Sequence, residues 1–74
     1  MSHLRRIRQL RRYTQVAVYI ATGIDQSLLS KYERGVRVPT AADLMLLAEL
    51  YQTSVDYLLE RTDVAEPYPA KGSK

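Results

Sequence analysis

The chain has 74 residues, 46% of them hydrophobic, with no Cys and a single His. This length provides one small domain with a small core, which excludes a deep catalytic cavity. The lack of thiols and the single imidazole exclude disulfides and the usual zinc sites, so we expect no metal and no cofactor. No apolar run approaches the roughly 20 residues that cross a bilayer, and the start of the chain lacks the apolar stretch of a signal peptide. We therefore expect a cytoplasmic protein that does not contact a membrane.

The charge is unevenly distributed along the chain. Residues 1–40 contain eight basic and two acidic residues, whereas residues 41–74 contain three basic and six acidic residues. A basic first part is typical of a surface that meets a polyanion such as nucleic acid. Basic N-terminal halves also occur in proteins with no nucleic-acid role, so the charge by itself leaves both possibilities open.

The first helix is expected to begin at Ser2, a good N-cap residue, and to end near Arg12. Leu4, Ile7 and Leu10 follow one another at a spacing of three residues and are expected to form its apolar side. The arginines of this segment occupy the remaining surface, so the helix should pack through the three apolar side chains.

Two further helices are predicted on either side of a glycine. Thr14 is a good N-cap for the second helix, and Gly23 ends that helix because it takes a left-handed conformation at no steric cost. Asp25 caps the third helix, and Gly35 ends it in the same way. The segment of residues 15–34 is therefore two short helices joined by a tight turn.

The last two helices are again marked by caps. Thr40, with Asp43 three residues later, begins a fourth helix that runs to Tyr51, and Ser54 caps a short fifth helix. No strand-like alternation and no hairpin signal is present. We therefore predict an all-α fold, a compact bundle of four to five short helices.

The predicted domain spans residues 1–61. Residues 62–74 contain too few apolar side chains to pack and are expected to form a disordered C-terminal tail. The apolar residues expected to form the core are Val18, Ile24, Leu29, Tyr32, Leu44, Leu47, Ala48, Tyr51, Val55 and Leu58.

The last two predicted helices carry more apolar residues than so small a domain needs. The surplus residues are Leu28, Leu46, Leu50 and Tyr57. An exposed apolar patch near the last two helices would form a dimer interface, at which we expect Leu50, Tyr57 and Leu58. The alternative is that these side chains complete the core.

Two helices around a glycine are typical of the helix-turn-helix arrangement, in which the second helix enters the DNA major groove. The spacing alone favours two packed helices with no ligand, because such helix pairs are abundant. The segment Leu10–Pro39 resembles the phage repressor/Cro-type (XRE-like) helix-turn-helix family, with the pattern T-Q-x-x-[LV]-A-x-x-x-G-[IV]-x-x-x-x-[IL]-S-x-[YIL]-E-x-G-x-x-x-P. The matching positions are Thr14-Gln15, Val18, Gly23-Ile24, Leu29-Ser30, Tyr32-Glu33, Gly35 and Pro39. The similarity extends from Leu4 to Arg61.

The resemblance implies a lambda-repressor-like DNA-binding domain with the helix-turn-helix at the second and third predicted helices. It also implies a sequence-specific, double-stranded DNA-binding transcriptional regulator, bacterial or phage-encoded, that acts as a dimeric repressor on a palindromic operator. Tyr19 departs from the family pattern, which usually has Ala there because the two helices cross closely. Thr22 is also less apolar than is usual at its position.

The candidate base-contacting residues are Gln26, Ser27, Ser30 and Lys31. Gln26 and Ser27 lie at the start of the third helix, and the other two lie one turn later on the same surface. Amide, hydroxyl and ammonium groups bond to base edges in the major groove. The alternative is that all four side chains form ordinary solvated helix surface.

The candidate phosphate-contacting residues are Gln15, Arg34, Arg37, Thr40 and Arg8. Gln15 lies in the first turn of the second helix, where the helix dipole and free N–H groups favour an anion. The resemblance implies an ion pair between Arg8 and Glu33 that supports the scaffold. The arginines expected to form only a general electrostatic surface are Arg5, Arg6, Arg11 and Arg12.

The sequence does not suggest an enzyme. His3 is expected in a frayed terminus, and neither a Ser-His-Asp spacing nor a phosphate-binding glycine loop is present. The expected partners are double-stranded DNA and a second copy of the chain, with a toxin or RNA polymerase as a possible protein partner. The alternative function is a protein-interaction module, or an antitoxin-like partner-binding protein, on the same scaffold.

Overall fold

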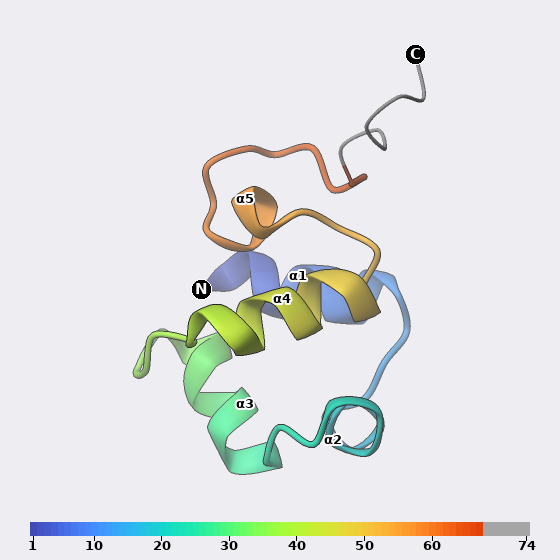
Figure 1. The fold of residues 1–74 in the computed structure, drawn as a ribbon, viewed down its shortest axis with the longest axis vertical. Helices are drawn as coiled ribbons and strands as arrows, with labels where there is room; N and C mark the ends of the chain where they lie inside the picture. Colours follow the sequence, from blue (N-terminus) through green and yellow to red (C-terminus); the bar gives the residue numbers. More distant parts are fainter. Residues whose placement is uncertain (68–74) are drawn as a thin grey trace.

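The computed structural model describes residues 1–67 and shows five short helices in that part of the chain (Figure 1). They are α1 (Ser2–Leu10), α2 (Gln15–Thr22), α3 (Gln26–Arg34), α4 (Ala41–Leu50) and α5 (Val55–Leu58). No strand occurs in residues 1–67, so the predicted all-α fold is confirmed there. The predicted tail of residues 62–74 lies outside the described residues from position 68 onward.

The predicted N-caps of four helices are confirmed, because each of these side chains accepts a hydrogen bond from a backbone N–H of the first turn. The capping pairs are Thr14 with Ala17, Asp25 with Ser27, Thr40 with Asp43, and Ser54 with Tyr57. The four starting points were therefore decided by the residues next to each helix.

The predicted N-cap of the first helix is wrong, whereas the helix ends close to the predicted position near Arg12. Met1 is the N-cap residue, and the Ser2 hydroxyl instead donates to Glu60, with Oγ and Oε2 3.2 Å apart. The helix ends at Leu10, because Arg12 takes a left-handed conformation with φ of 65°. Leu10 is 58% exposed, whereas the two apolar residues before it are buried. Steps of three residues fall short of a full turn of 3.6, so a third apolar residue rotates away from the buried face.

The helices pack around one core. Helix α3 lies against α1 and α2, and α4 lies against α2 and α5. In Figure 1, α4 crosses in front of α1, with α5 on one side of them and the α2–α3 pair on the other. Every predicted core residue is buried except Val55, which is partly buried. The core also contains Leu4 and Ile7 from the predicted apolar side of the first helix, together with Tyr57.

The start of the chain is tied to its last described part. His3 is only 6% exposed, so the expectation of a frayed terminus is wrong. Its ring stacks on Tyr57 at 4.3 Å between centroids, and its Nδ1 lies 2.7 Å from the Tyr57 carbonyl oxygen. Its Nε2 lies 3.5 Å from Asp63 Oδ1. The Thr53 hydroxyl donates to the Ala65 carbonyl, and Ala65 packs against the core, so residues 62–67 fold back over the domain.

None of the helices in residues 1–67 is long and apolar enough to cross a membrane.

Candidate nucleic-acid interface

The turn between α2 and α3 is held by one glycine and one threonine. Gly23 adopts a φ of +80°, which L side chains rarely adopt, and its N–H donates to the Tyr19 carbonyl. The Thr22 hydroxyl donates to the Val18 carbonyl at 2.7 Å and accepts from Ile24 N–H at 3.1 Å. The residue that departs from the usual apolar pattern therefore supplies two hydrogen bonds that fix the turn.

Helix α3 is buried on one side and exposed on the other. Leu29, Tyr32 and Glu33 are buried and hold the helix against α1 and α2. The exposed side carries Gln26, Ser27 and Lys31, whereas Ser30 is half-buried. The structure thus brings three of the four candidate base-contacting residues to one free surface.

Asp25 holds the start of this surface in place. Its Oδ2 accepts hydrogen bonds from the Ser27 hydroxyl at 2.9 Å and from the Ser27 N–H at 3.0 Å. The bond from the hydroxyl, and next that from the N–H, lower the pKa of the Asp25 carboxyl from its ordinary value. The Ser27 hydroxyl is therefore oriented by its own helix cap, with its oxygen lone pairs still able to accept.

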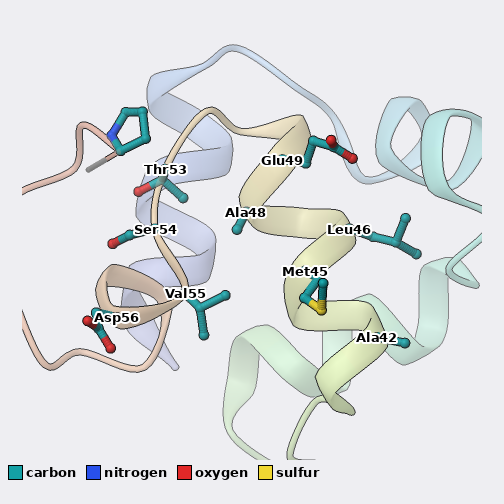
Figure 2. Close-up of a pocket in the computed structure, with 10 residues that line it drawn as sticks. Ala42, Met45, Leu46, Ala48, Glu49, Thr53, Ser54, Val55 and Asp56 are labelled. Atoms are coloured by element: carbon teal, nitrogen blue, oxygen red, sulfur yellow. The ribbon is translucent and has the colours of Figure 1, made fainter. Parts of the chain in front are cut away.

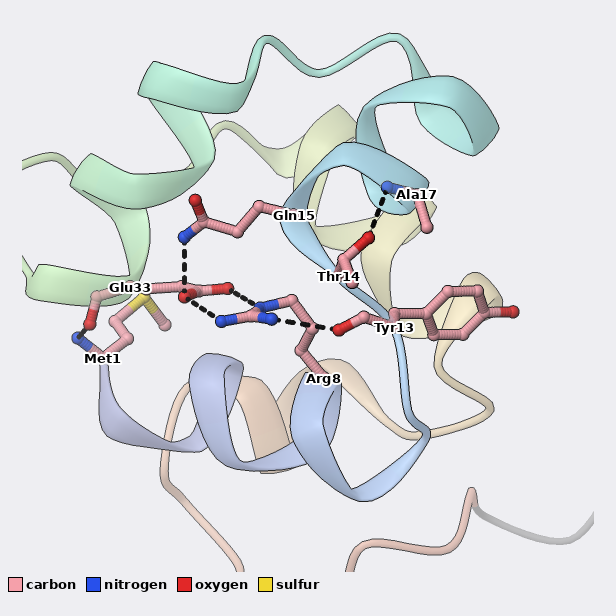
Figure 3. Close-up of polar contacts among 7 residues, drawn as sticks. All are labelled: Met1, Arg8, Tyr13, Thr14, Gln15, Ala17 and Glu33. Atoms are coloured by element: carbon pink, nitrogen blue, oxygen red, sulfur yellow. Dashed lines mark hydrogen bonds and ion pairs between the residues drawn. The ribbon is translucent and has the colours of Figure 1, made fainter.

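A buried ion pair joins α1 to α3 (Figure 3). Arg8 Nε donates to Glu33 Oε2 at 2.6 Å, and Arg8 Nη2 donates to Glu33 Oε1 at 3.1 Å. The side chains are 12% and 4% exposed, respectively. The hydrogen bond to Glu33 is the main cause that raises the pKa of Arg8, so the guanidinium stays charged. The ion pair that the family resemblance implied is present.

The same ion pair also binds α2. Gln15 Nε2 donates to Glu33 Oε1 at 3.2 Å, and Arg8 Nη1 donates to the Tyr13 carbonyl oxygen at 3.0 Å. Figure 3 shows the Arg8 guanidinium between the Glu33 carboxylate and the chain segment that enters α2. Because three helices share one polar cluster, the orientation of α3 depends on Arg8 and Gln15 as well as on apolar packing.

The segment after α3 is basic and exposed. Arg34, Arg37 and Thr40 are all exposed, and the Thr40 hydroxyl accepts the Asp43 N–H at 3.1 Å. The Tyr32 hydroxyl donates to Asp43 Oδ2 at 2.5 Å and so links α3 to the start of α4. Burial, followed by this hydrogen bond, raises the pKa of Tyr32. The loop between the two helices is thus fixed at both ends.

Tyr19 is accommodated without entering the seam between α2 and α3. Its side chain is 49% exposed, and Val16 and Ile20 beside it are 48% and 76% exposed. These residues lie three and four positions apart, so they share the outer face of α2. The bulky residue has been turned to the surface, and Val18 fills the core from the other side of the helix.

The comparison with known proteins identifies the family. A helix-turn-helix family model matches residues 4–58. The chain belongs to this family.

The curated relatives of this helix-turn-helix chain come from Bacillus subtilis (strain 168). The HTH-type transcriptional regulator ImmR is 38% identical over 63 residues, which cover 85% of this chain and 50% of that protein. The uncharacterized HTH-type transcriptional regulator YobD is 36% identical over 64 residues, 86% of this chain and 57% of that protein. The uncharacterized HTH-type transcriptional regulator YazB is 40% identical over 55 residues, which cover 74% of this chain and 80% of that protein.

The helix-turn-helix chain thus spans about half the length of the first two relatives. No solved structure matches the chain in the corresponding search.

The helix-turn-helix domain also has an apolar groove on α4 and α5 (Figure 2). Its apolar lining includes Ala42, Met45, Leu46 and Val55. The acidic lining residues are Glu49 and Asp56. No group of three or more His, Asp or Glu side chains within residues 1–67 is placed to hold a metal ion.

The residues expected at a dimer interface lie mostly inside the monomer. Tyr57 is 3% exposed and Leu58 is fully buried, because α5 turns both side chains towards α1 and α4. Leu50 is partly buried against the same core. The core of the monomer therefore accounts for Tyr57 and Leu58, and the large apolar side chains left exposed on α4 are Met45 and Leu46.

Proposed function

We propose that the chain is a sequence-specific regulator of transcription that binds double-stranded DNA by inserting α3 into the major groove. The observation that carries this proposal is the free polar side of α3, with Gln26, Ser27 and Lys31, on a helix whose other side is buried. Membership of the helix-turn-helix family and the printed names of its relatives, which are HTH-type transcriptional regulators, support it.

The base contacts proposed for this surface follow from side-chain chemistry. The amide of Gln26 can accept and donate together at the adenine edge, and Lys31 can donate to guanine O6 and N7. The Ser27 hydroxyl already donates a hydrogen bond to the Asp25 carboxylate, so it is expected to accept a hydrogen bond from a base. The half-buried Ser30 is less exposed than these three, so we propose that it contacts the DNA backbone and not a base.

The phosphate contacts proposed here flank α3. Arg37 and Thr40 lie on the exposed segment that follows the helix, and Arg34 lies in its last turn. Gln15 uses one amide N–H for Glu33 and keeps the second for a phosphate near the start of α2. Such contacts set the position of the protein on the duplex without distinguishing bases.

The proposed mode of action is repression by a dimer that occupies a palindromic operator. A two-fold dimer places two copies of α3 about one turn of DNA apart, which requires two inverted half-sites. Met45 and Leu46, which are exposed and line the groove on α4, are the large apolar side chains available for such a contact. The same groove is the observation that favours the second candidate function, a module that binds another protein such as a toxin or RNA polymerase.

The test is the selection of bound duplexes from a random DNA pool with purified protein, followed by affinity measurements at several salt concentrations. An enriched palindrome whose affinity falls steeply with salt is expected for the regulator. A pool without enrichment would overturn sequence-specific DNA binding. It would favour the second candidate function, a module that binds another protein through the groove on α4 and α5.

The Gln26→Ala variant tests the assigned surface. It is expected to weaken binding to the selected site by about 1–3 kcal/mol and to relax the preference at one base pair. The exposed Arg61→Ala change, far along the chain at the end of the domain, is the control and should leave base preference unchanged. Equal preferences in the parent and the Gln26 variant would show that another surface contacts the bases.

A further inference from the structure

A small polar pocket lies where α1, α2 and α3 meet, beside the Arg8–Glu33 ion pair. Its lining residues are Arg5, Arg8, Gln15, Ser30, Glu33 and Arg34. Each of the three helices therefore contributes a polar side chain to the same space. The sequence pattern had assigned one of these residues, Arg5, only to a general electrostatic surface.

The pocket has an excess of positive charge. Both carboxylate oxygens of Glu33 accept hydrogen bonds from Arg8, and one accepts a further bond from Gln15. The charges of Arg8 and Glu33 thus offset one another. Arg5 and Arg34 are exposed, and neither forms an ion pair within residues 1–67. Two guanidinium groups without a carboxylate partner therefore border the pocket, which favours an anion.

Arg8 itself has little capacity left for that anion. Its Nε and Nη2 donate to Glu33, and its Nη1 donates to the Tyr13 carbonyl oxygen. An additional strong contact would have to compete with these bonds, which are made by a largely buried side chain. Arg8 is accordingly a positioning residue that sets the distance between α1 and α3 at the pocket.

We propose that Arg5 and Arg34 together bind one phosphate of the DNA backbone in this pocket, with Ser30 and the free amide N–H of Gln15 as further donors. A guanidinium presents paired N–H groups that match the oxygens of a phosphate. The pocket lies on the side of α3 that faces α1 and α2, so this contact joins all three helices to the backbone. The inference rests on the proposed function, because it adds α1 to the DNA-binding surface.

The first experiment measures affinity and its salt dependence on the duplex selected from the random pool. Arg5→Gln and Arg34→Gln are each expected to lose about tenfold in affinity and to reduce the salt slope by about 1. Arg6→Gln is the matched control, because Arg6 is an exposed arginine on the same helix that does not line the pocket. Equal losses in the Arg5 and Arg6 variants would overturn the inference. Thermal unfolding verifies that the variants remain folded.

The second experiment needs no DNA. Inorganic phosphate is titrated into the protein while the side-chain Nε–H signals of the arginines are followed by NMR. Saturable shifts confined to Arg5 and Arg34, with the Arg34 response lost in Arg5→Gln, are expected. Shifts of similar size at all exposed arginines would overturn the pocket.

The two experiments separate failure of the pocket from failure of the proposed function. If phosphate selects Arg5 and Arg34 but no duplex is enriched, the anion pocket stands and sequence-specific DNA binding is overturned. If a duplex is enriched while Arg5 and Arg6 show the same affinity losses and the same phosphate-induced shifts, DNA binding stands and the pocket is overturned.

Discussion

Glu33 shows how a single side chain fixes the relation between helices in this protein. A carboxylate removed from water is costly unless it is paired and hydrogen-bonded. Here it accepts bonds from Arg8 on α1 and Gln15 on α2 while it is carried by α3. The family resemblance predicted the partner Arg8, but nothing in the local sequence predicted Gln15.

The Glu33→Gln variant is expected to be destabilised by about 3 kcal/mol, because it leaves the Arg8 charge largely buried without its partner. Urea unfolding followed by circular dichroism measures the change. Glu49→Gln, at an exposed carboxylate on α4, should alter the free energy of unfolding by less than about 0.5 kcal/mol. A Glu33 variant as stable as this control would mean that apolar packing alone holds α3.

The Asp25 carboxyl gives a pH dependence whose sign follows from its partners. Its pKa is below the ordinary value of 3.8, chiefly because the Ser27 hydroxyl and N–H donate to its charged form. A carboxyl with a lowered pKa in the folded state stabilises the fold above the ordinary value. That contribution is lost as the pH falls through the lowered value.

Asp25→Asn keeps a capping oxygen but does not titrate. The difference in thermal midpoint between the parent and this variant is therefore expected to be larger at neutral pH than at a pH low enough to protonate the Asp25 carboxyl. Midpoints measured over a pH series provide the comparison. A difference that stays constant over the series would contradict the role of the charge.

At the scale of the elements, the α2–α3 turn is the part of the molecule that neighbouring residues fix most completely. The glycine takes the left-handed conformation predicted for it, and the cap of α3 follows within two residues. Thr22 adds hydrogen bonds on both sides of the turn. The sequence did not predict these bonds, because it showed Thr22 only as a residue that is less apolar than is usual in the family. The separation of the two helices is thus set by a few adjacent residues.

Gly23→Ala isolates the backbone contribution of this turn. No atom lies within 4 Å of the position that a Cβ would take, so only the φ of +80° is strained. We expect a loss of about 1 kcal/mol, seen as a thermal midpoint lower by about 4–8 °C. Gly23→Asn should lose less, because Asn tolerates this conformation better. A larger loss in the Asn variant than in the Ala variant would contradict the assignment to backbone strain.

At the scale of the whole molecule, side chains of opposite charge border two different hollows. Arg5 and Arg34 border the pocket between α1 and α3, whereas Glu49 and Asp56 border the groove on α4 and α5. A polyanion is attracted to the first surface and not to the second. The basic pocket and the apolar groove therefore lie on different helices of the domain.

Met45→Glu tests whether that groove joins two copies. Met45 is 67% exposed, so the fold is expected to persist, while a charge in an apolar contact should weaken the dimer. We expect at least about tenfold weaker binding to the full palindrome, with little change on a single half-site. Sedimentation equilibrium checks the oligomeric state. Unchanged binding to the palindrome would place the dimer contact elsewhere.

The sequence by itself determined the family, the all-α class and most of the helix boundaries. Caps and helix-ending glycines act through neighbouring residues, so Thr14, Gly23 and Asp25 were informative without knowledge of the fold. The exposed side of α3 was also predictable, since residues three and four apart share a helix face.

Only the tertiary structure decided which faces are covered and which distant groups meet. His3 and Tyr57 stack across 54 positions of sequence, and this contact buries an imidazole expected at a frayed end. Tyr19 is exposed because nothing packs over the outer face of α2 within the described residues. The pocket that contains Arg5 exists because three helices converge there, which no spacing along one helix encodes. Local backbone preferences are properties of adjacent residues, whereas burial and ion pairing are properties of the assembled fold.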